Sequence, residues 1–278
     1  MSKVWFVTGA TRGIGAEIVR AALAAGDTVV ATGRKPEAIR GAFADAGDAL
    51  LALPLDVTNA DQIAAAVDAA VARFGRIDVL VNNAGYGQLG LFEETAIGDA
   101  ERQFATNVFG LFDMTRAVLP VMRGQRAGHI FNLSSIAGLR GGLGGSIYCS
   151  SKFAVEGFSE SLAQEVEPFG IHVTVVEPGF FRTDFLDETS VSFGTQAIDD
   201  YAEVSAQLRN GYRDRNHRQA GDPAKLGAMI VDLSSLAEPP FRYAAGSDSA
   251  EIFAAKIARL QGELEATKAL SIKTDGSF

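Results

Sequence analysis

The stretch VWFVTGATRGIG, residues 4–15, joins a short apolar run to a glycine-rich turn and the start of an amphipathic helix. Gly9 permits a tight turn, Gly13 lets backbone N–H groups approach an anion, and Gly15 allows the helix to pack closely on the strand. The helix N-terminus directs its positive dipole end toward such an anion. This strand–turn–helix predicts a pyrophosphate site, although its G-x-x-x-G-x-G spacing differs from the common G-x-G-x-x-G. The same turn supplies three further predicted binding residues, Thr11, Arg12 and Ile14.

Apolar runs rich in Val, Ile, Leu and Phe alternate with longer helical patterns along the rest of the chain. Near-continuous apolar strands are typical of a parallel sheet buried on both faces. Strands are predicted at residues 4–7, 28–32, 49–55, 77–81, 129–133, 171–177 and 241–245. Helices are predicted at residues 15–25, 37–46, 60–74, 97–122, 151–168, 223–236 and 250–269. The alternation predicts an α/β fold, a doubly wound seven-stranded parallel sheet with helices on both faces, in a single domain over residues 1–278.

Composition excludes several classes of protein. With a formal net charge of -9, the chain lacks the basic surface that nucleic-acid binding requires. The single cysteine, Cys149, indicates a reducing compartment, and the three histidines are too widely separated to favour a zinc site. The N-terminal sequence lacks the features of a signal peptide, and no apolar run approaches the ~18 residues of a membrane span. We therefore expect a cytoplasmic protein with no membrane span, no nucleic-acid partner and no metal.

Two segments interrupt the alternation of strands and helices. Residues 138–145, GLRGGLGG, contain five glycines after the fifth predicted strand, which predicts a small, flexible wall and a roomy site. Residues 180–222 are long and weakly periodic. Their aromatic residues favour a substrate lid over a disordered segment.

The end of the second predicted strand indicates which nucleotide binds. Proteins that bind NAD place an acidic residue there to hold the ribose 2′-hydroxyl. This sequence has Gly33 followed by Arg34, whose guanidinium suits a phosphate, and Arg12 is a second cation nearby. The alternative is that Arg34 and Lys35 are solvated loop charges, as most surface cations are. Two cations and a missing acid predict a preference for NADP(H) over NAD(H).

Tyr148 and Lys152 stand four residues apart in YCSSK, so a phenol and an ammonium share one helix face. Tyrosine has an ordinary pKa near ~10 and needs roughly 4 kcal/mol of phenolate stabilisation to act as a base at neutral pH. A nearby cation, a hydroxyl donor and a bound nicotinium could together lower its pKa. Ser135, beyond the fifth strand, can hydrogen-bond a substrate carbonyl, while Ser134 suits a turn or cap. We predict a catalytic set of Tyr148, Lys152 and Ser135.

Two amide-bearing segments have both a structural and a functional interpretation. NNAG, residues 82–85, closes the fourth strand and suits a plain turn. The same turn could hold the centre of the sheet and admit a nucleotide ribose. Asn107 lies inside an otherwise apolar helix, where an amide is more often a satisfied core group. Both interpretations stay open for each segment.

The motifs taken together resemble the short-chain dehydrogenase/reductase family, in its main single-domain branch. The resemblance rests on TGATRGIG at 8–15, LDVT at 55–58, NNAG at 82–85, Asn107, NLSS at 132–135, YCSSK at 148–152 and EPGFFRTDF at 177–185. The segment YCSSKFAVEGFSESLAQEV is similar to hydroxysteroid- and retinol-dehydrogenase-like carbonyl reductases. The resemblance implies a Rossmann-type fold and a homodimer or homotetramer assembled through the helices after the fourth and fifth strands.

The resemblance also implies a role for each matched residue. Tyr148 would be the acid/base, Ser135 the partner of the substrate carbonyl, and Lys152 the residue that binds the nicotinamide ribose and lowers the tyrosine pKa. Asn107 would hold a water of a proton relay. Cofactor contacts would come from Asp56 and Val57 at the adenine, Asn83, Ala84 and Gly85 at the ribose, and Pro178, Gly179 and Thr183 at the nicotinamide.

The favoured hypothesis is an NADPH-dependent oxidoreductase that interconverts an uncharged, apolar ketone or aldehyde and its alcohol by hydride transfer. The aromatic lid and the absence of an evident arginine clamp favour this small-molecule substrate, while Arg140 and Arg182 leave a case for a carboxylate. One alternative is an NADP-binding sensor without turnover, against which the intact catalytic set argues. Another is an epimerase or dehydratase, for which the sequence offers no additional acid/base pair.

Overall fold

The computed structural model describes residues 2–187 and 190–276. Seven parallel strands form one sheet in the order β3-β2-β1-β4-β6-β7-β9. The strands are β1 (Val4–Val7), β2 (Thr28–Gly33), β3 (Leu50–Pro54), β4 (Val79–Asn82), β6 (Gly128–Leu133), β7 (Ile171–Pro178) and β9 (Arg242–Ala245). The order reverses between β1 and β4, which confirms the predicted doubly wound fold. Such a reversal creates a crevice at the carboxyl ends of the strands.

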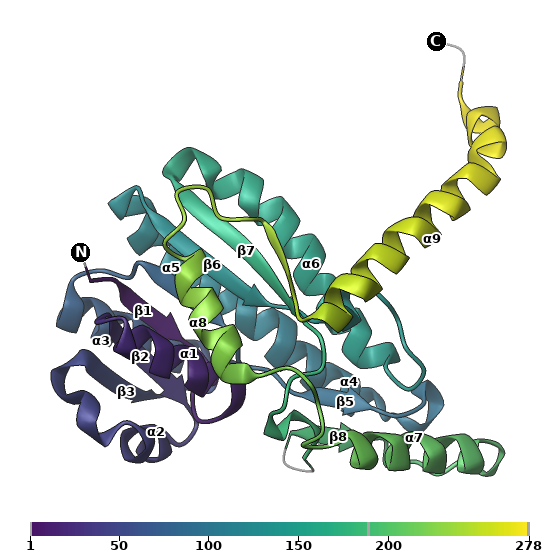
Figure 1. Cartoon of the computed structure of the whole chain (residues 1–278), viewed down its shortest axis with the longest axis horizontal. Helices are drawn as coiled ribbons and strands as arrows, with labels where there is room; N and C mark the ends of the chain where they lie inside the picture. The colour runs from purple at the N-terminus through teal and green to yellow at the C-terminus, as the bar shows by residue number, and fades with distance from the viewer. Residues whose placement is uncertain (1, 188–189, 277–278) are drawn as a thin grey trace.

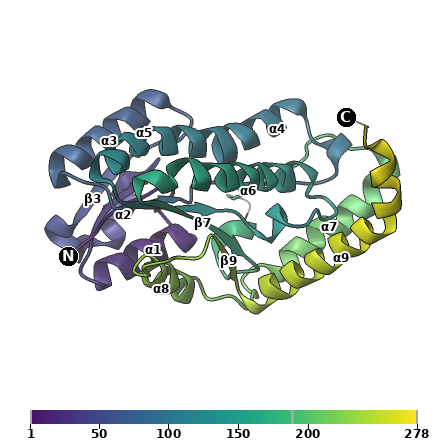
Figure 2. The same cartoon turned by 90° about the horizontal axis from the view of Figure 1, so that it is seen from above.

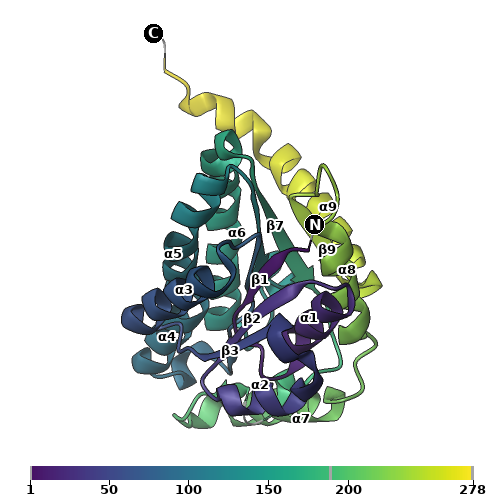
Figure 3. The same cartoon turned by 90° about the vertical axis from the view of Figure 1, so that its left-hand side faces the viewer.

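Helices cover both faces of this sheet (Figure 1, Figure 3). One face carries α1 (Gly13–Ala24), α2 (Pro36–Ala42) and α8 (Pro223–Leu233). The other face carries α3 (Ala60–Phe74), α5 (Gly110–Gln125) and α6 (Ser146–Val166). The short helix α4 (Ile97–Phe104) leads into α5.

Strand β1 shows why the sheet is buried on both sides. Trp5 and Val7 belong to the apolar cluster beneath α1 and α8, whereas Phe6 belongs to the cluster beneath α3, α5 and α6. All three side chains are fully buried. Successive residues of a strand point to opposite faces, and burying each large apolar side chain contributes about 1.5–3 kcal/mol. The apolar run at residues 4–7 therefore fixes the middle of a three-layer structure.

Helix boundaries agree with the sequence where strong signals exist. The Asn59 side chain caps α3 by accepting from Gln62 N at 3.0 Å, and Gly75 ends the helix with φ 75°. The prediction of a helix at 60–74 is confirmed. The predicted helix 37–46 is wrong at its end, because the backbone leaves the helical region at Phe43 (φ -130°).

Two boundary errors affect the candidate site. The predicted helix 97–122 is divided by a π-helical turn at Ala105–Phe109, and such turns often accompany functional sites. The predicted helix 151–168 begins instead at Ser146, because Gly145 is the last helix-breaking residue before it. Tyr148 consequently lies in the first turn of α6.

Residues 180–222 contain more regular structure than their weak periodicity predicted. Strand β8 (Val191–Phe193) pairs with β5 (Gly87–Leu89) in a separate two-stranded sheet, and α7 (Ala202–Arg215) follows. Residues 188 and 189 of the predicted lid lie outside the described residues. After β9, the long helix α9 (Ser247–Ser271) extends away from the body in Figure 1 and runs along the edge of the molecule opposite α3 in Figure 2.

Candidate active site

A cavity of about 1180 Å³ opens where the glycine turn, the carboxyl ends of the central strands and the lid segment meet. Apart from Gly15 and Asn107, every sequence-predicted cofactor and catalytic residue lines it. The lining predicted residues are Gly9, Thr11, Arg12, Gly13, Ile14, Arg34, Asp56, Val57, Asn83, Ala84, Gly85, Ser135, Tyr148, Lys152, Pro178, Gly179 and Thr183. Residues separated by most of the chain are thus brought into one space.

The glycine turn leaves room for a ligand at the N-terminus of α1. Gly9 and Gly13 have φ values of +66° and +58°, which residues with a side chain rarely adopt. A Cβ on Gly15 would lie 2.5 Å from the Gly9 carbonyl oxygen, which is why Gly15 packs behind the turn and does not line the cavity. No side chain caps α1 within the described chain, and its first turn carries no acid. The N-terminal N–H groups therefore suit an anion such as a pyrophosphate.

The NNAG turn, residues 82–85, is hydrogen-bonded both to the glycine turn and to neighbouring elements at the centre of the sheet. The Asn83 side-chain amide donates to the carbonyl oxygens of Thr8 and Gly9 at 2.9 and 3.0 Å. Asn82 donates to Asn132 Oδ1 at 2.9 Å and to Thr115 Oγ1 at 3.0 Å, which links β4 to β6 and α5. These bonds confirm that the turn holds the sheet centre. Its contact with a ribose stays a prediction.

The end of β2 faces the same cavity. A Cβ on Gly33 would lie 2.7 Å from Thr11 Cγ2, so the glycine allows β2 to approach the glycine turn. Hydrogen bonds from Thr58 hold the pKa of the Asp56 carboxyl below its ordinary value, and Arg34 acts in the same direction. Arg12, the other predicted cation, donates to Ser190 Oγ of the lid segment at 2.7 Å. Arg34 and Arg12 therefore place two cations in this part of the cavity, beside the Asp56 carboxylate.

Tyr148, Ser135 and Lys152 come together from α6 and the end of β6. Lys152 Nζ donates to the Leu133 carbonyl oxygen at 2.6 Å and lies 5.9 Å from the centroid of the Tyr148 ring. Ser135 Oγ accepts from Ala137 N at 3.1 Å and also interacts with the Tyr148 hydroxyl. Ser135 thus performs the capping role that was predicted for Ser134.

The pKa of Tyr148 differs from the sequence expectation. Burial raises this pKa above its ordinary value, and the hydrogen bond with Ser135 only partly opposes the increase. Burial also lowers the pKa of Lys152 to about 8, although the neighbouring Glu156 acts to raise it. The Tyr148/Lys152 spacing predicted a lowered pKa for Tyr148, but the effect of desolvation on this pKa is larger and has the opposite sign. At neutral pH the phenol keeps its proton and Lys152 remains mostly charged.

Three glutamates surround Arg242 in a cluster that begins one helical turn beyond Lys152. The sequence did not predict this cluster. Glu156, one helical turn beyond Lys152, accepts from Arg242 of β9, and Arg242 also reaches Glu177 Oε1 at 3.1 Å and the exposed Glu160 at 3.0 Å. Glu177 is fully buried, and burial raises its pKa to about 7. Burial raises the pKa of Glu156 as well. Lys152 and Glu156 are four residues apart in the sequence, and this helical spacing could have indicated that their opposite charges lie close together.

Asn107 does not line the cavity but hydrogen-bonds to the chain segment that follows the NNAG turn. Its Oδ1 accepts from Tyr86 N at 3.1 Å and its Nδ2 donates to the Tyr86 carbonyl oxygen at 3.0 Å. A weaker contact joins Nδ2 to Ser151 Oγ at 3.4 Å. Asn107 therefore fixes the chain just after Gly85, which confirms the structural interpretation. The water relay stays a prediction.

The glycine-rich loop is less uniform than its sequence suggested. Of its five glycines, only Gly142 and Gly145 line the cavity. A Cβ on Gly138 would lie 2.4 Å from Ser134 Oγ, so this glycine serves packing. Gly144, with φ +72°, lies against Leu208 of α7. The loop thus supports the lid segment as well as the cavity wall.

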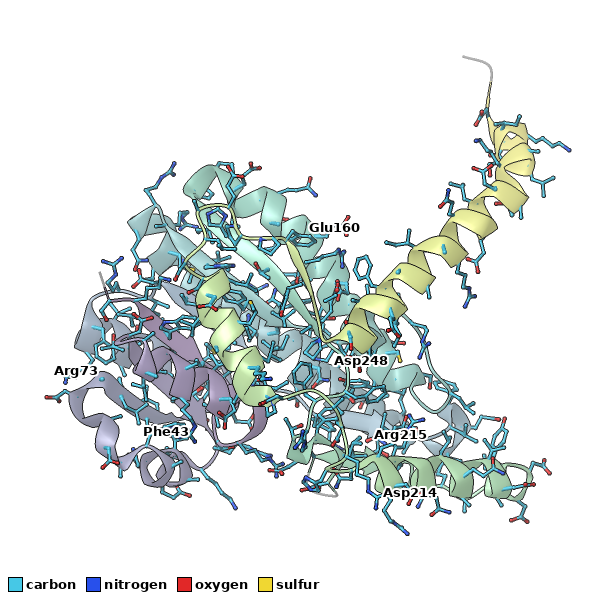
Figure 4. The ribbon with its side chains drawn as sticks, viewed as in Figure 1. Phe43, Arg73, Glu160, Asp214, Arg215 and Asp248 are labelled. Atoms are coloured by element: carbon cyan, nitrogen blue, oxygen red, sulfur yellow. The ribbon has the colours of Figure 1, made fainter. Side chains whose placement is uncertain are left out.

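The remaining cavity wall comes mostly from the lid segment and the glycine-rich loop and combines polar side chains, such as Asp184, Ser192 and Gln207, with apolar ones. It includes Leu143, Phe180, Phe181, Phe185, Leu186, Val204, Leu208 and Tyr212. Arg140 lines the cavity as expected, but Arg182 does not, and its Nε donates to the Gln219 carbonyl oxygen at 3.3 Å. Arg102 of α4 and Arg215 of α7, the latter labelled in Figure 4, also line the cavity, and no sequence motif indicated either of them.

The lid segment also brings Asp184, Asp187 and His217 together, with their ligand atoms within 4.8 Å of one another. His217 is exposed, and its Nε2 lies 3.1 Å from Asp187 Oδ1. A hydrogen-bonded pair accounts for this arrangement. Across residues 2–187 and 190–276, no helix combines the length and hydropathy needed to cross a bilayer.

Comparison with known proteins agrees with the fold and the site. Residues 3–192 match the short chain dehydrogenase family. The oxidoreductase BOA17 of Botryotinia fuckeliana is 40% identical over 261 residues, which cover 94% of each protein. A 3-ketodihydrosphingosine reductase of Bacteroides thetaiotaomicron is 39% identical over 244 residues, which cover 88% of each.

Solved structures show the same likeness. A short-chain dehydrogenase from Streptomyces avermitilis superposes with a TM-score of 0.92 at 40% identity, covering 99% of this chain and all of the other. A Burkholderia phymatum relative in complex with NAD gives 0.77 at 26% identity, covering 87% and 88%. A serine dehydrogenase complexed with NADP⁺ gives 0.71 at 32% identity, covering 84% and 89%. The protein is a member of the short-chain dehydrogenase/reductase family of oxidoreductases.

Proposed function

We propose that this protein is an NADPH-dependent reductase of uncharged, apolar ketones or aldehydes, with Tyr148 as the general acid. The observation that carries the proposal is the position of the Tyr148 hydroxyl, which shares a cavity with the glycine turn and interacts with Ser135. NADPH, when bound, would supply a hydride to the carbonyl carbon. The Tyr148 hydroxyl donates its proton to the carbonyl oxygen, to which the Ser135 hydroxyl also donates a hydrogen bond.

The protonation states of the site support reduction. Burial raises the pKa of Tyr148, so the phenol retains the proton that a general acid must give. Lys152 has a pKa of about 8 and lies beside the same ring, so at neutral pH its ammonium favours the phenolate left by proton transfer. Lys152 then assists the forward step even though it does not dominate the pKa of the resting phenol.

Positive charge at the nucleotide end supports a preference for NADPH. Arg34 lines the cavity immediately after β2, where an NAD-binding protein would place a carboxylate. Its guanidinium can form paired hydrogen bonds with a 2′-phosphate. Arg12 lines the same cavity from the glycine turn.

The apolar side chains of the cavity wall support an uncharged substrate. Phe180, Phe185 and Leu208 line the substrate side together with other apolar residues of the lid segment. The name of the 39% identical 3-ketodihydrosphingosine reductase denotes reduction of a keto group, which is the proposed reaction class.

We also propose a homodimer or homotetramer through α5 and α6. Phe109, at the start of α5, and Phe153 of α6 are 56% and 43% exposed.

A substrate screen tests this function. The purified protein is offered ketones, aldehydes, quinones and steroids, each with NADPH and with NADH, and loss of the reduced nicotinamide absorbance is followed. We expect turnover of apolar carbonyl compounds, faster with NADPH. Faster turnover with NADH would contradict the cofactor preference. Tight NADPH binding with no turnover of any compound would instead favour the sensor hypothesis.

A further inference from the structure

Helix α9 is anchored to the protein at its base, and farther along the helix the Lys256 ammonium lies 5.9 Å from the centroid of the Phe153 ring of α6. The Asp248 carboxylate accepts from Phe180 N at 2.7 Å, and Ser249 Oγ donates to the Glu177 carbonyl oxygen at 2.6 Å (Figure 4). Beyond this base, α9 extends away from the body (Figure 1). Of its 25 residues, all of which are described, only Ser249 is buried. A helix surrounded by water is marginally stable, because most helical stability in proteins comes from packing one apolar face.

An apolar stripe runs along α9, and its outer part is exposed among the residues that the structure describes. Phe253, Ile257, Leu260 and Leu264 are separated by four, three and four residues, which is the a/d spacing of a coiled coil. Phe253 is half-buried near the base. The other three side chains are 54%, 48% and 58% exposed, respectively. Such a stripe fits another helix with the same spacing.

The charges beside the stripe are complementary to those of a second α9. Lys256 and Glu263 each immediately precede a stripe residue, Ile257 and Leu264, and therefore lie on the same flank. In an antiparallel pair, Lys256 faces the partner's Glu263, while Ile257 packs on the partner's Leu260. In a parallel pair, Glu263 faces the partner's Lys268 instead. Neither orientation opposes two like charges at these flanking positions, so the helix is self-complementary.

We propose that α9 pairs with the α9 helix of a second copy of this chain, in a contact separate from the one expected through α5 and α6. A two-fold contact uses the same surface patch on both copies, which suits a self-complementary stripe. The pairing covers Ile257, Leu260 and Leu264 and leaves the catalytic cavity unchanged.

Light scattering coupled to size-exclusion chromatography tests the pairing on the full chain. Leu260→Glu buries a charge in the stripe, and we expect the assembly mass to fall to half that of the wild type. Ala269→Glu, on the opposite side of α9, is the matched control and should keep the wild-type mass. Circular dichroism checks that both variants remain folded. A monomeric wild type, or equal masses for the wild type and Leu260→Glu, would overturn the proposal.

Charge exchange tests whether the partner helix is α9 itself. Glu263→Lys should weaken the assembly, because it places two ammonium groups side by side in either orientation. Adding Lys256→Glu restores an antiparallel pair, whereas adding Lys268→Glu restores a parallel pair. Arg259→Gln controls for the exposed Arg259–Glu263 bridge within one helix, which contributes little. If neither second change restores the mass, α9 contacts another part of the partner and the proposed pairing is wrong.

Discussion

The buried carboxyl of Glu177 should make the free energy of unfolding depend on pH. Its pKa rises from an ordinary 4.5 to about 7 in the folded protein. The folded chain therefore holds this proton more tightly than the unfolded chain. The stabilisation is complete below pH 4.5 and is lost as pH rises through about 7. The pKa difference corresponds to a loss of about 3 kcal/mol between these limits.

Glu177→Gln isolates this contribution, because the amide mimics the protonated carboxyl at every pH. We expect the variant to be more stable than the wild type by about 3 kcal/mol at pH 8 and by less than about 1 kcal/mol at pH 5. Thermal unfolding followed by circular dichroism should show a Tm difference of roughly 6–12 °C at pH 8. Glu160→Gln is the control, because Glu160 contacts the same Arg242 but is exposed (Figure 4).

The pH series also tests the cluster around Glu177. Arg242 and Glu156 are the charged groups facing this carboxyl, and Glu156 also has a raised pKa. Because the wild type and Glu177→Gln share these groups, the difference between their curves reports mainly on Glu177. Parallel Tm curves from pH 5 to pH 8 would refute the reasoning, since they would mean that Glu177 stays ionised throughout.

Three further predictions concern the cofactor site and the lid segment. Arg34→Ala should raise the KM for NADPH about 10- to 100-fold and leave the KM for NADH nearly unchanged, because one charge-assisted phosphate contact is worth about 1.5–3 kcal/mol; equal effects on both cofactors in steady-state kinetics would argue against the 2′-phosphate contact. Gly15→Ala should lower the free energy of unfolding by about 1–3 kcal/mol, because its Cβ would lie 2.5 Å from the Gly9 carbonyl oxygen; an unchanged denaturation midpoint would contradict this packing. Amide exchange in α7 should slow when NADPH and a substrate bind together, and identical exchange with and without them would remove the lid function.

The sheet could be predicted because its strands carry a strong local signal. β1, β2 and β7 are buried on both faces, so their apolar runs are almost continuous in the sequence. The cavity could be predicted because its glycines and amides lie at strand ends that the fold must bring together. Asn83 illustrates this, since its bonds to Thr8 and Gly9 join two motifs that stand far apart in the chain.

The remaining features depend on tertiary contacts that leave no local pattern. β5 and β8 are three residues each and exist through their mutual pairing, so periodicity does not reveal them. Asn107, inside the π-helical turn, bonds to the backbone of Tyr86, which belongs to a different part of the chain. The raised pKa of Tyr148 arises from burial by surrounding elements, whereas the sequence displayed only the nearby lysine.

The most direct test of the account is the rate of carbonyl reduction by Tyr148→Phe. The change removes the proposed proton donor but retains the ring that packs 5.6 Å from Phe185, so NADPH binding should persist. With a ketone found in the screen, we expect kcat to fall at least about 100-fold, the lower range for general acid catalysis. Tyr243→Phe, a tyrosine packed against the core on the α1 and α8 side of the sheet, is the matched control and should keep wild-type kcat. Near-wild-type turnover by Tyr148→Phe would contradict the central claim.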